Sequence, residues 1–167
     1  NFKKVKNLQI VPSSSDESLV FGALFSENIK NNQKVDIVKN LYLGRSSENE
    51  LINVVNNLDK KKFKVKKFNN NFELNDYVST LLKNNNIVAR CCGREEWGAR
   101  ALGNRSILSN PSYMSNIKKI NHAIKQRDYF MPFSPTILDI YEKNYIIKKK
   151  LFDASYMTCL FDTTKLA

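Results

Sequence analysis

The sequence has few of the residues that bend, cross-link or anchor a chain. Of its 167 residues, five are glycine, four proline, three cysteine, one histidine and one tryptophan. Cys91 and Cys92 are adjacent, which makes an ordinary disulfide between them geometrically awkward, and no cysteines have metal-ligand spacing. No apolar run is long enough to span a bilayer, and the residues Asn1-Phe2-Lys3-Lys4 do not have the apolar character of a signal-peptide core. The sequence therefore predicts a cytoplasmic protein with reduced thiols and no membrane association.

Arginine is also scarce, and its placement is uneven. The chain has 21 lysines but only six arginines, and five of these lie between Arg90 and Arg127. Three of the five glycines and the single tryptophan fall within Gly93–Ser106. Arginine grips phosphate or carboxylate with a planar fork that lysine lacks, and glycine lets backbone approach a ligand closely. Gly93–Ser106 is therefore predicted to be an oxyanion-binding loop, although a solvated arginine face would have the same composition.

The net charge of +11 raises the question of nucleic acid. Much of the charge comes from lysine runs at residues 60–67 and 148–150, which lack interleaved arginines and the pattern of a stacking platform. The chain also carries 22 asparagines, so joint enrichment in lysine and asparagine is typical of a compositional bias. The charge by itself does not indicate a nucleic-acid partner.

The hydrophobic pattern predicts alternating helices and strands, and hence an α/β or α+β fold. Helices are expected over residues 17–25, 48–58 and 72–82 and from Ser115 onward, with a connector at 28–40. Strands are expected over residues 8–11, 63–68, 87–92, 107–108, 134–140 and 156–161. The strand at 87–92 runs directly into Gly93, so the arginine-rich loop should follow a strand's carboxyl end, where ligands tend to sit.

A second basic group follows the helix that is predicted from Ser115. Lys125 and Arg127 are two residues apart, so both could be aimed at one anion, and Pro132 and Pro135 would stiffen the segment that follows. The alternative is a pair of cations that complement the dipole at a helix C-terminus. His122 on the same helix has no partner histidine or cysteine and is assigned no catalytic role.

These motifs together resemble a known family. The sequence is similar to the carbamoyltransferase family of nodulation protein NodU and its antibiotic-tailoring relatives in three motifs. In chain order these are Gly-Arg-x-Glu-Trp-Gly-Ala-Arg-Ala-Leu-Gly-x-Arg-Ser, Asn-x-x-Ile-Lys-x-Arg and Pro-Phe-x-Pro. The resemblance implies that residues 1–40 are the end of an actin/hexokinase-type (kinase-like) domain plus a linker. Residues 41–167 would then be most of a YrdC-like domain, with a twisted mixed sheet flanked by helices.

What the resemblance implies for activity is carbamoyl transfer in two steps. Carbamoyl phosphate and ATP, with Mg²⁺, would give a carbamoyl-adenylate, and the carbamoyl group would pass to a hydroxyl of a sugar or natural-product acceptor. Catalytic roles are expected for Arg94, Lys125 and Arg127. Substrate or nucleotide binding is expected for Glu96, Gly98, Arg100, Gly103, Arg105 and Ser106, with Glu96 orienting an arginine.

Asp16 matches an aspartate that helps to hold a divalent metal such as iron in the kinase-like half of the family. The partner histidines of that site are not in this sequence, so the metal site is expected to be incomplete. The chain is expected to be part of a longer enzyme and to be inactive as a transferase by itself. The alternative is a YrdC-type module that binds RNA or nucleotide without transferase activity.

The sequence departs from the family pattern at several positions. Trp97 replaces the phenylalanine of the family pattern, Ala99 a proline, Ser18 a glycine, and Met131 the arginine that usually precedes Pro-Phe. Two interpretations of Met131 remain open. It either occupies a place in the ligand site from which a cation has been lost, or packs with Phe130 and Phe133 in the core.

Overall fold

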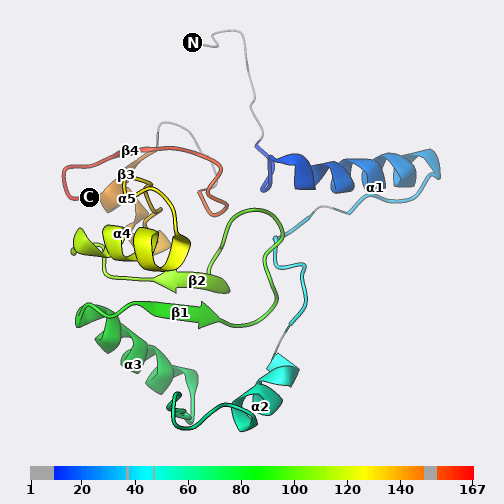
Figure 1. Ribbon diagram of the computed structural model, residues 1–167. Coiled ribbons are helices and arrows are strands. Elements are labelled where there is room, and N and C mark those ends of the chain that lie inside the picture. Colours follow the sequence, from blue (N-terminus) through cyan, green and yellow to red (C-terminus); the bar gives the residue numbers. More distant parts are fainter. Residues whose placement is uncertain (1–9, 37, 47, 149–153) are drawn as a thin grey trace. The chain divides into compact units, whose positions relative to one another are not determined.

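The computed structural model describes residues 10–36, 38–46, 48–148 and 154–167 as a mixed α/β arrangement (Figure 1). The chain divides into two compact units, each assembled from separate stretches of sequence. Unit 1 comprises Asn1–Gly44, Glu95–Leu102 and Ile137–Ala167, and unit 2 comprises Arg45–Arg94 and Gly103–Thr136. The predicted oxyanion-binding loop is therefore shared, because its middle belongs to unit 1 and its two ends belong to unit 2.

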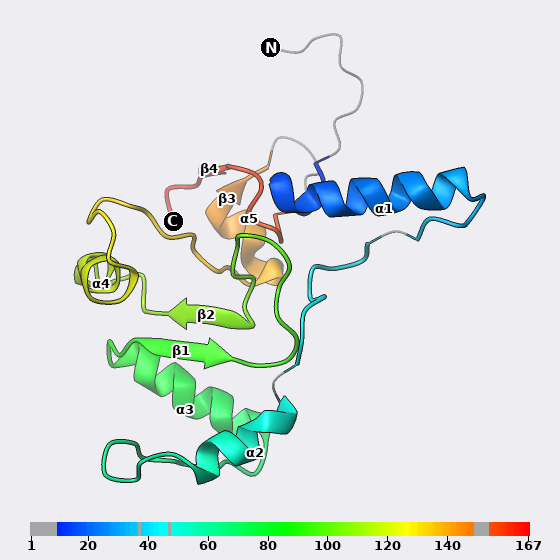
Figure 2. The ribbon, with the colours of Figure 1, turned by 45° about the vertical axis from the view of Figure 1, so that its right-hand side comes forward.

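Unit 2 contains a β-hairpin with a helix along it. Strands β1 (Val88–Cys91) and β2 (Arg105–Leu108) pair antiparallel, with Val88 opposite Leu108 and Cys91 opposite Arg105. Helices α2 (Glu48–Asn56) and α3 (Asn71–Lys83) precede the hairpin, and α3 lies along β1 in both views (Figures 1 and 2). After β2 come α4 (Ser115–Lys119) and a wider, π-helical turn at Ile120–Lys125.

Unit 1 consists of short elements and one longer helix. A 3₁₀ turn at Asp16–Ser18 leads into α1 (Leu19–Lys30), and a second 3₁₀ turn at Asp139–Tyr141 leads into α5 (Glu142–Tyr145). The two-residue strands β3 (Ile146–Ile147) and β4 (Asp162–Thr163) pair antiparallel beside α5, as Figure 2 shows. None of the described helices is long and apolar enough to cross a bilayer.

Little apolar surface is fully buried in either unit. Within the described ranges the buried apolar side chains are Leu41 in unit 1, which is 4% exposed, and Ile120 in unit 2, which is 3% exposed. Helix α1 buries none of its residues. A side-chain cap is present at α3, where the Asn70 side chain accepts a hydrogen bond from the Glu73 N–H at 2.9 Å, whereas α1, α4 and α5 have none.

The structure confirms the predicted class, a mixture of helices and strands, and the main predicted elements. The helix predicted at 17–25 runs on to Lys30, so the connector starts later than expected, and the helices at 48–58 and 72–82 are α2 and α3. The strands predicted at 87–92 and 107–108 are β1 and β2. The sheets are two antiparallel pairs in the described residues, so the YrdC-like mixed sheet and the boundary at residue 40 stay predictions.

The strand predicted at residues 63–68 is wrong. The segment pairs with no other described strand, and its alternating Phe63 and Val65 are more than half exposed. The ammonium group of Lys66 lies over the ring of Tyr77, 4.2 Å from its centroid. Alternation predicts which residues share a face, but a strand also needs a partner edge, and this loop has none.

Two further predicted strands are wrong for local reasons. In residues 134–140 the chain turns into the 3₁₀ turn at Asp139–Tyr141, where the Asp139 carboxylate accepts a hydrogen bond from the Ile140 N–H at 2.8 Å. In residues 156–161 the left-handed Met157 (φ +55°) interrupts extended backbone, and β4 starts only at Asp162. The strand predicted at 8–11 lies partly outside the described residues, and Ile10 and Val11 are not in a strand.

The helix predicted from Ser115 is confirmed as α4. Ser115 is its first residue, and Met114 holds the cap position without a side-chain hydrogen bond. Three isoleucines follow at helical spacing, Ile117, Ile120 and Ile124, of which only Ile120 is buried, and Ile124 is 47% exposed. The widened turn at Ile120–Lys125 rotates the last residues away from regular α-helical spacing.

Candidate functional site

The two ends of the arginine-rich loop are tied together in unit 2. The Cys92 N–H donates to the Asn104 carbonyl at 3.0 Å, and the Asn104 side-chain amide donates to the Arg94 carbonyl at 2.8 Å. Gly93 has a φ of +53°, and a Cβ atom at this position would lie 3.2 Å from the Asn104 amide nitrogen. Backbone conformation therefore favours glycine at this position, and a larger residue would also need the Asn104 amide to shift by a few tenths of an ångström.

The side chain of Arg105 is directed at the loop's own backbone. Its Nη1 donates to the carbonyls of Cys92 at 2.7 Å and Asn104 at 3.1 Å, and its Nη2 reaches the Gly93 carbonyl at 3.4 Å. A planar guanidinium group that donates to several carbonyls at once ties together the end of β1 and the start of β2. Arg105 therefore has a structural function in this conformation, and its predicted contact with phosphate stays a prediction.

Ser106 and Gly103 also bond to each other. The Ser106 hydroxyl accepts a hydrogen bond from the Gly103 N–H at 3.1 Å. Gly103 has a φ of +114°, and a Cβ atom built there would meet nothing within 4 Å. Backbone conformation, rather than crowding, therefore calls for glycine here. The structure places Arg94, Gly103, Arg105 and Ser106 together around one hairpin.

The middle of the loop is held by contacts within unit 1. The Glu96 carboxylate accepts a hydrogen bond from the Leu102 N–H at 2.8 Å, which closes residues 96–102 into a compact turn. The backbone N–H of Trp97 donates to the Leu41 carbonyl, and the indole ring packs edge-on against Phe21 with centroids 5.4 Å apart. Glu96 thus bonds to backbone, and a role for it in orienting an arginine stays a prediction.

Gly98 lies against the start of the first helix. Its φ is +99°, and a Cβ atom there would come within 3.1 Å of both the Ser13 hydroxyl and the Glu17 carboxylate. The Ser13 hydroxyl donates to Glu17 at 2.6 Å. The pKa of Glu17 lies below its ordinary value, chiefly because of this bond. Hydrogen bonds from its own N–H, the Ser15 hydroxyl and the Ala99 N–H also lower the pKa, and burial raises it by less than these bonds together lower it. Sequence reasoning missed Glu17, although its place in the first helical turn was available as a signal.

These contacts border a pocket of about 280 Å³ in unit 1. Arg100 lines it with no hydrogen bond or ion pair to any described residue, so its guanidinium group is available to an anion. The pocket is built from four stretches of chain, lined by Pro12, Ser13, Ser14, Ser15, Glu17, Leu41, Trp97, Gly98, Ala99, Arg100, Leu102, Tyr156, Met157 and Thr158.

Asp16 is exposed at the start of its 3₁₀ turn and is not among the residues that line this pocket. In the part of the chain that the structure describes, no group of three or more His, Cys, Asp and Glu side chains could hold a metal ion. One carboxylate does not make a metal site. The described residues therefore do not form a metal site by themselves.

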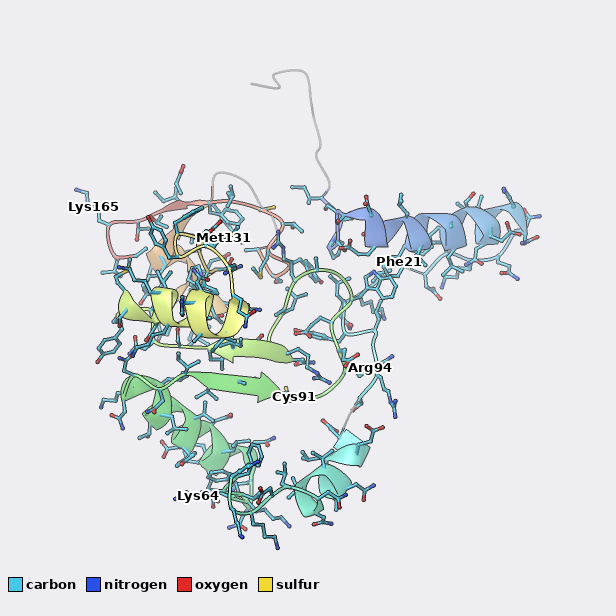
Figure 3. All side chains as sticks on the ribbon, in the orientation of Figure 1. Phe21, Lys64, Cys91, Arg94, Met131 and Lys165 are labelled. Carbon is cyan, nitrogen blue, oxygen red and sulfur yellow. The ribbon has the colours of Figure 1, made fainter. Side chains whose placement is uncertain are left out.

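A second pocket, of about 560 Å³ and open to solvent, lies in unit 2 where the helical turn ends. It is lined by His122, Gln126, Arg127, Asp128 and Met131. Lys125 immediately precedes Gln126, which has a left-handed conformation (φ +48°) and reverses the chain so that Arg127 folds back toward the helix. Met131 follows on the same loop (Figure 3) and is 40% exposed, so its side chain lies at the pocket rather than in a core.

Comparison with known proteins identifies the family. The chain matches the family model described as carbamoyltransferase C-terminus over residues 79–167, which is more than half of its length. The match includes both the β1–β2 loop and the turn that carries Lys125 and Arg127. The chain therefore belongs to the carbamoyltransferase C-terminus family.

Individual relatives agree with this assignment and confirm the resemblance to NodU. An uncharacterized protein of Methanocaldococcus jannaschii is 33% identical over 159 residues, which is 93% of this chain and 29% of that protein. Nodulation protein NolO of Bradyrhizobium diazoefficiens is 41% identical over 58 residues, 35% of this chain and 11% of the relative. Nodulation protein U of Azorhizobium caulinodans is 44% identical over 62 residues, 37% of this chain and 11% of the relative. The chain thus spans less than a third of the length of each.

Proposed function

We propose that this chain is the part of an ATP-dependent carbamoyltransferase that binds the carbamoyl donor and ATP. In the proposed reaction, water hydrolyses carbamoyl phosphate to phosphate and carbamate, and an oxygen of the carbamate attacks the α-phosphorus of ATP. Pyrophosphate leaves and carbamoyl-adenylate remains. A hydroxyl oxygen of a sugar or natural-product acceptor then attacks the carbamoyl carbon, and AMP leaves. Both donors are polyanions, so bringing them together needs fixed positive charge.

The observation that carries this proposal is the pocket at Arg127, within the segment that matches the family. Arg127 lines the pocket with His122, and Lys125 lies on the turn that forms it. Lys125 makes no hydrogen bond or ion pair with any described residue. One guanidinium and one ammonium group on a single turn are suited to a phosphate that carries two negative charges.

The same pocket also suits the other end of carbamoyl phosphate. Asp128 lines it directly after Arg127, and no described side chain forms an ion pair with its carboxylate. The carbamoyl group ends in an amide nitrogen that donates hydrogen bonds, and a carboxylate is a strong acceptor for them. In our proposal Arg127 and Lys125 bind the phosphate, and Asp128 accepts from the carbamoyl amide.

Contacts with ATP stay predictions for the remaining residues, which belong to different units: Arg94, Gly103 and Ser106 to unit 2, and Glu96, Gly98 and Arg100 to unit 1. Arg100 has the clearest support among them, because its guanidinium group has no partner in the described residues. Mg²⁺ would accompany the nucleotide and neutralise part of its phosphate charge. The acceptor step is assigned to the rest of a longer enzyme, as the length of the relatives supports.

The test is calorimetric titration of the chain with carbamoyl phosphate. Arg127→Ala should weaken binding at least tenfold, since a charge-assisted contact contributes about 1.5–3 kcal/mol. The control variant replaces Lys60, Lys61 and Lys62 by glutamine, which removes three charges from the exposed loop after α2 while leaving the pocket intact. Affinity should then change less than about twofold at physiological salt. Equal losses in the two variants would show non-specific attraction and refute the site.

The competing function, RNA binding, predicts a different result. An RNA-binding module would lose affinity for RNA steeply with salt and would depend on the lysine loop rather than on Arg127. Figure 3 shows Lys64 on that loop, between α2 and α3. Its neighbour Lys66 already lies over the rings of Phe68 and Tyr77, at 4.9 and 4.2 Å from their centroids, which leaves these rings less available to stack on bases.

A further inference from the structure

A buried asparagine lies beneath the turn that carries Lys125 and Arg127. Asn121 is 0% exposed, and no other side chain in the described ranges is as fully enclosed. It lies in the widened turn Ile120–Lys125, and its backbone carbonyl accepts a hydrogen bond from the Arg127 N–H at 3.1 Å. A polar group so completely buried is tolerated only when its hydrogen bonds are made.

The side-chain amide of Asn121 makes three hydrogen bonds. Its nitrogen donates to the carbonyls of Tyr129 at 3.2 Å and Met131 at 2.9 Å. Its oxygen accepts from the Nε of Arg127 at 2.8 Å. Carbonyls can only accept and a guanidinium group can only donate, so one orientation of the amide satisfies all three partners. Asparagine is the side chain whose donor and acceptor fit this set.

These bonds fix how Arg127 is presented. Its Nε is held by Asn121, its Nη2 lies 3.5 Å from the Pro132 carbonyl, and its plane lies over the Phe133 ring at 4.7 Å from the centroid. The protein therefore occupies the inner edge and one face of the guanidinium group. Nη1 has no partner among the described residues, so the outer edge, Nη1 with Nη2, remains for a ligand.

We propose that Asn121 is a positioning residue that orients Arg127 to receive phosphate, an inference that depends on the proposed function of that pocket. The same amide holds the carbonyls of Tyr129 and Met131, so one buried group fixes both the cation and the loop that borders the pocket. An arginine held in its binding orientation loses less conformational freedom when the anion arrives. Removing Asn121 should therefore weaken phosphate binding without removing any group that touches phosphate.

The chain offers a matched control in Asn116. This asparagine is 2% exposed, lies on the preceding helix α4, and donates from its side chain to Asn85 at 2.8 Å and to the Asn110 carbonyl at 3.2 Å. Neither of these hydrogen bonds involves Arg127. Asn116→Ala and Asn121→Ala both remove a buried amide with at least two hydrogen bonds, so both should lower the melting temperature. Only Asn121→Ala should change phosphate affinity.

The experiment is a double-mutant cycle, with the dissociation constants of inorganic phosphate and carbamoyl phosphate measured by calorimetry on the whole 167-residue chain. Asn121→Ala should weaken binding about tenfold in the parent protein and less than about twofold in an Arg127→Ala background. Asn116→Ala should change affinity less than about twofold in both backgrounds. If Asn121→Ala fails to fold, Asn121→Ser, which leaves a smaller void, takes its place in the same cycle.

The possible failures are distinguishable. If Arg127→Ala leaves phosphate affinity unchanged, the proposed pocket is wrong, whatever Asn121 does. If Arg127→Ala weakens binding but Asn121→Ala does not, the pocket stands and the positioning role is refuted. An effect of Asn121→Ala that persists in the Arg127→Ala background, or that Asn116→Ala reproduces, also refutes positioning, because loosening of the fold then explains the loss.

Discussion

Substitution of Arg105 would show whether the arginine-rich loop is held by its own arginine. In the structure the Arg105 guanidinium group meets the carbonyls of Cys92, Asn104 and Gly93 at 2.7, 3.1 and 3.4 Å. A hydrogen bond that involves a charged group contributes about 1.5–3 kcal/mol. The three contacts share one side chain and are not additive, so Arg105→Ala should lower the free energy of unfolding by about 2 kcal/mol.

Arg105→Lys should have an intermediate effect. Lysine keeps the charge but offers one nitrogen, which cannot reach several carbonyls in the planar arrangement of the guanidinium group. A loss of about 1 kcal/mol is expected, and at roughly 2–4 °C per kcal/mol for a chain of this length the melting temperature should fall by about 2–4 °C. Arg105→Ala should lower it by about 4–8 °C on the same scale.

The assay is thermal unfolding together with titration of carbamoyl phosphate, on both variants and on a matched control. Arg45 pairs with Glu50 on the exposed surface, so Arg45→Lys should change the melting temperature by less than about 2 °C. If Arg105→Lys keeps the parent melting temperature but loses affinity tenfold, Arg105 contacts the ligand instead of closing the loop. That result would refute the structural function and support the contact expected from the sequence.

Three further predictions concern Met131 at the pocket, the Asn70 cap of α3 and the Glu17 carboxylate. Met131→Arg, which adds a cation at the pocket, should tighten carbamoyl phosphate binding about tenfold with little change in melting temperature; a large thermal loss without a gain in affinity would instead show core packing. Asn70→Ala removes the cap of α3 and should cost about 1 kcal/mol in a denaturant titration, whereas Asn70→Asp should cost less. The pKa of Glu17 is lowered in the folded protein, chiefly by the Ser13 hydroxyl, so its stabilisation is present above the unfolded pKa and is lost as pH falls through the folded one. Glu17→Gln should therefore reduce the fall in melting temperature between about pH 6 and pH 3, and an unchanged fall would contradict this.

The sequence predicted best the elements that local pattern determines. A short apolar run that ends at Gly93 correctly predicted β1, and helical spacing of apolar residues correctly predicted α2 and α3. It predicted residues 63–68 wrongly because alternation describes a face, whereas a strand also needs a neighbouring edge. Pairing depends on residues far away in the chain, and the composition of the segment itself does not contain that information.

The candidate site was predictable as a set of residue types but not as a set of contacts. The two segments in which arginine is concentrated both fall within the family match, and their function as a ligand site stays a prediction. The concentration of arginine could not show that Arg105 is directed inward, onto carbonyls of its own loop. The motif Asn-x-x-Ile-Lys-x-Arg begins with Asn121 but assigns it no role, because the function of a buried amide depends on the donors and acceptors around it, and these become neighbours only in the folded turn.

The different contacts of the arginines explain why a lysine-rich chain needs guanidinium groups in these places. Arg105 uses two nitrogens on three carbonyls, and Arg127 uses its inner edge and one face on protein groups while keeping its outer edge available. Neither arrangement is open to an ammonium group, which has no plane and no fork. Lys125 makes no such contacts with the described residues, so the point charge of an ammonium group is sufficient at that position. Part of the arginine concentration that indicated a ligand site thus follows from architecture, and the groups that we propose for anions are the outer edge of Arg127, Lys125 and, in the other unit, Arg100.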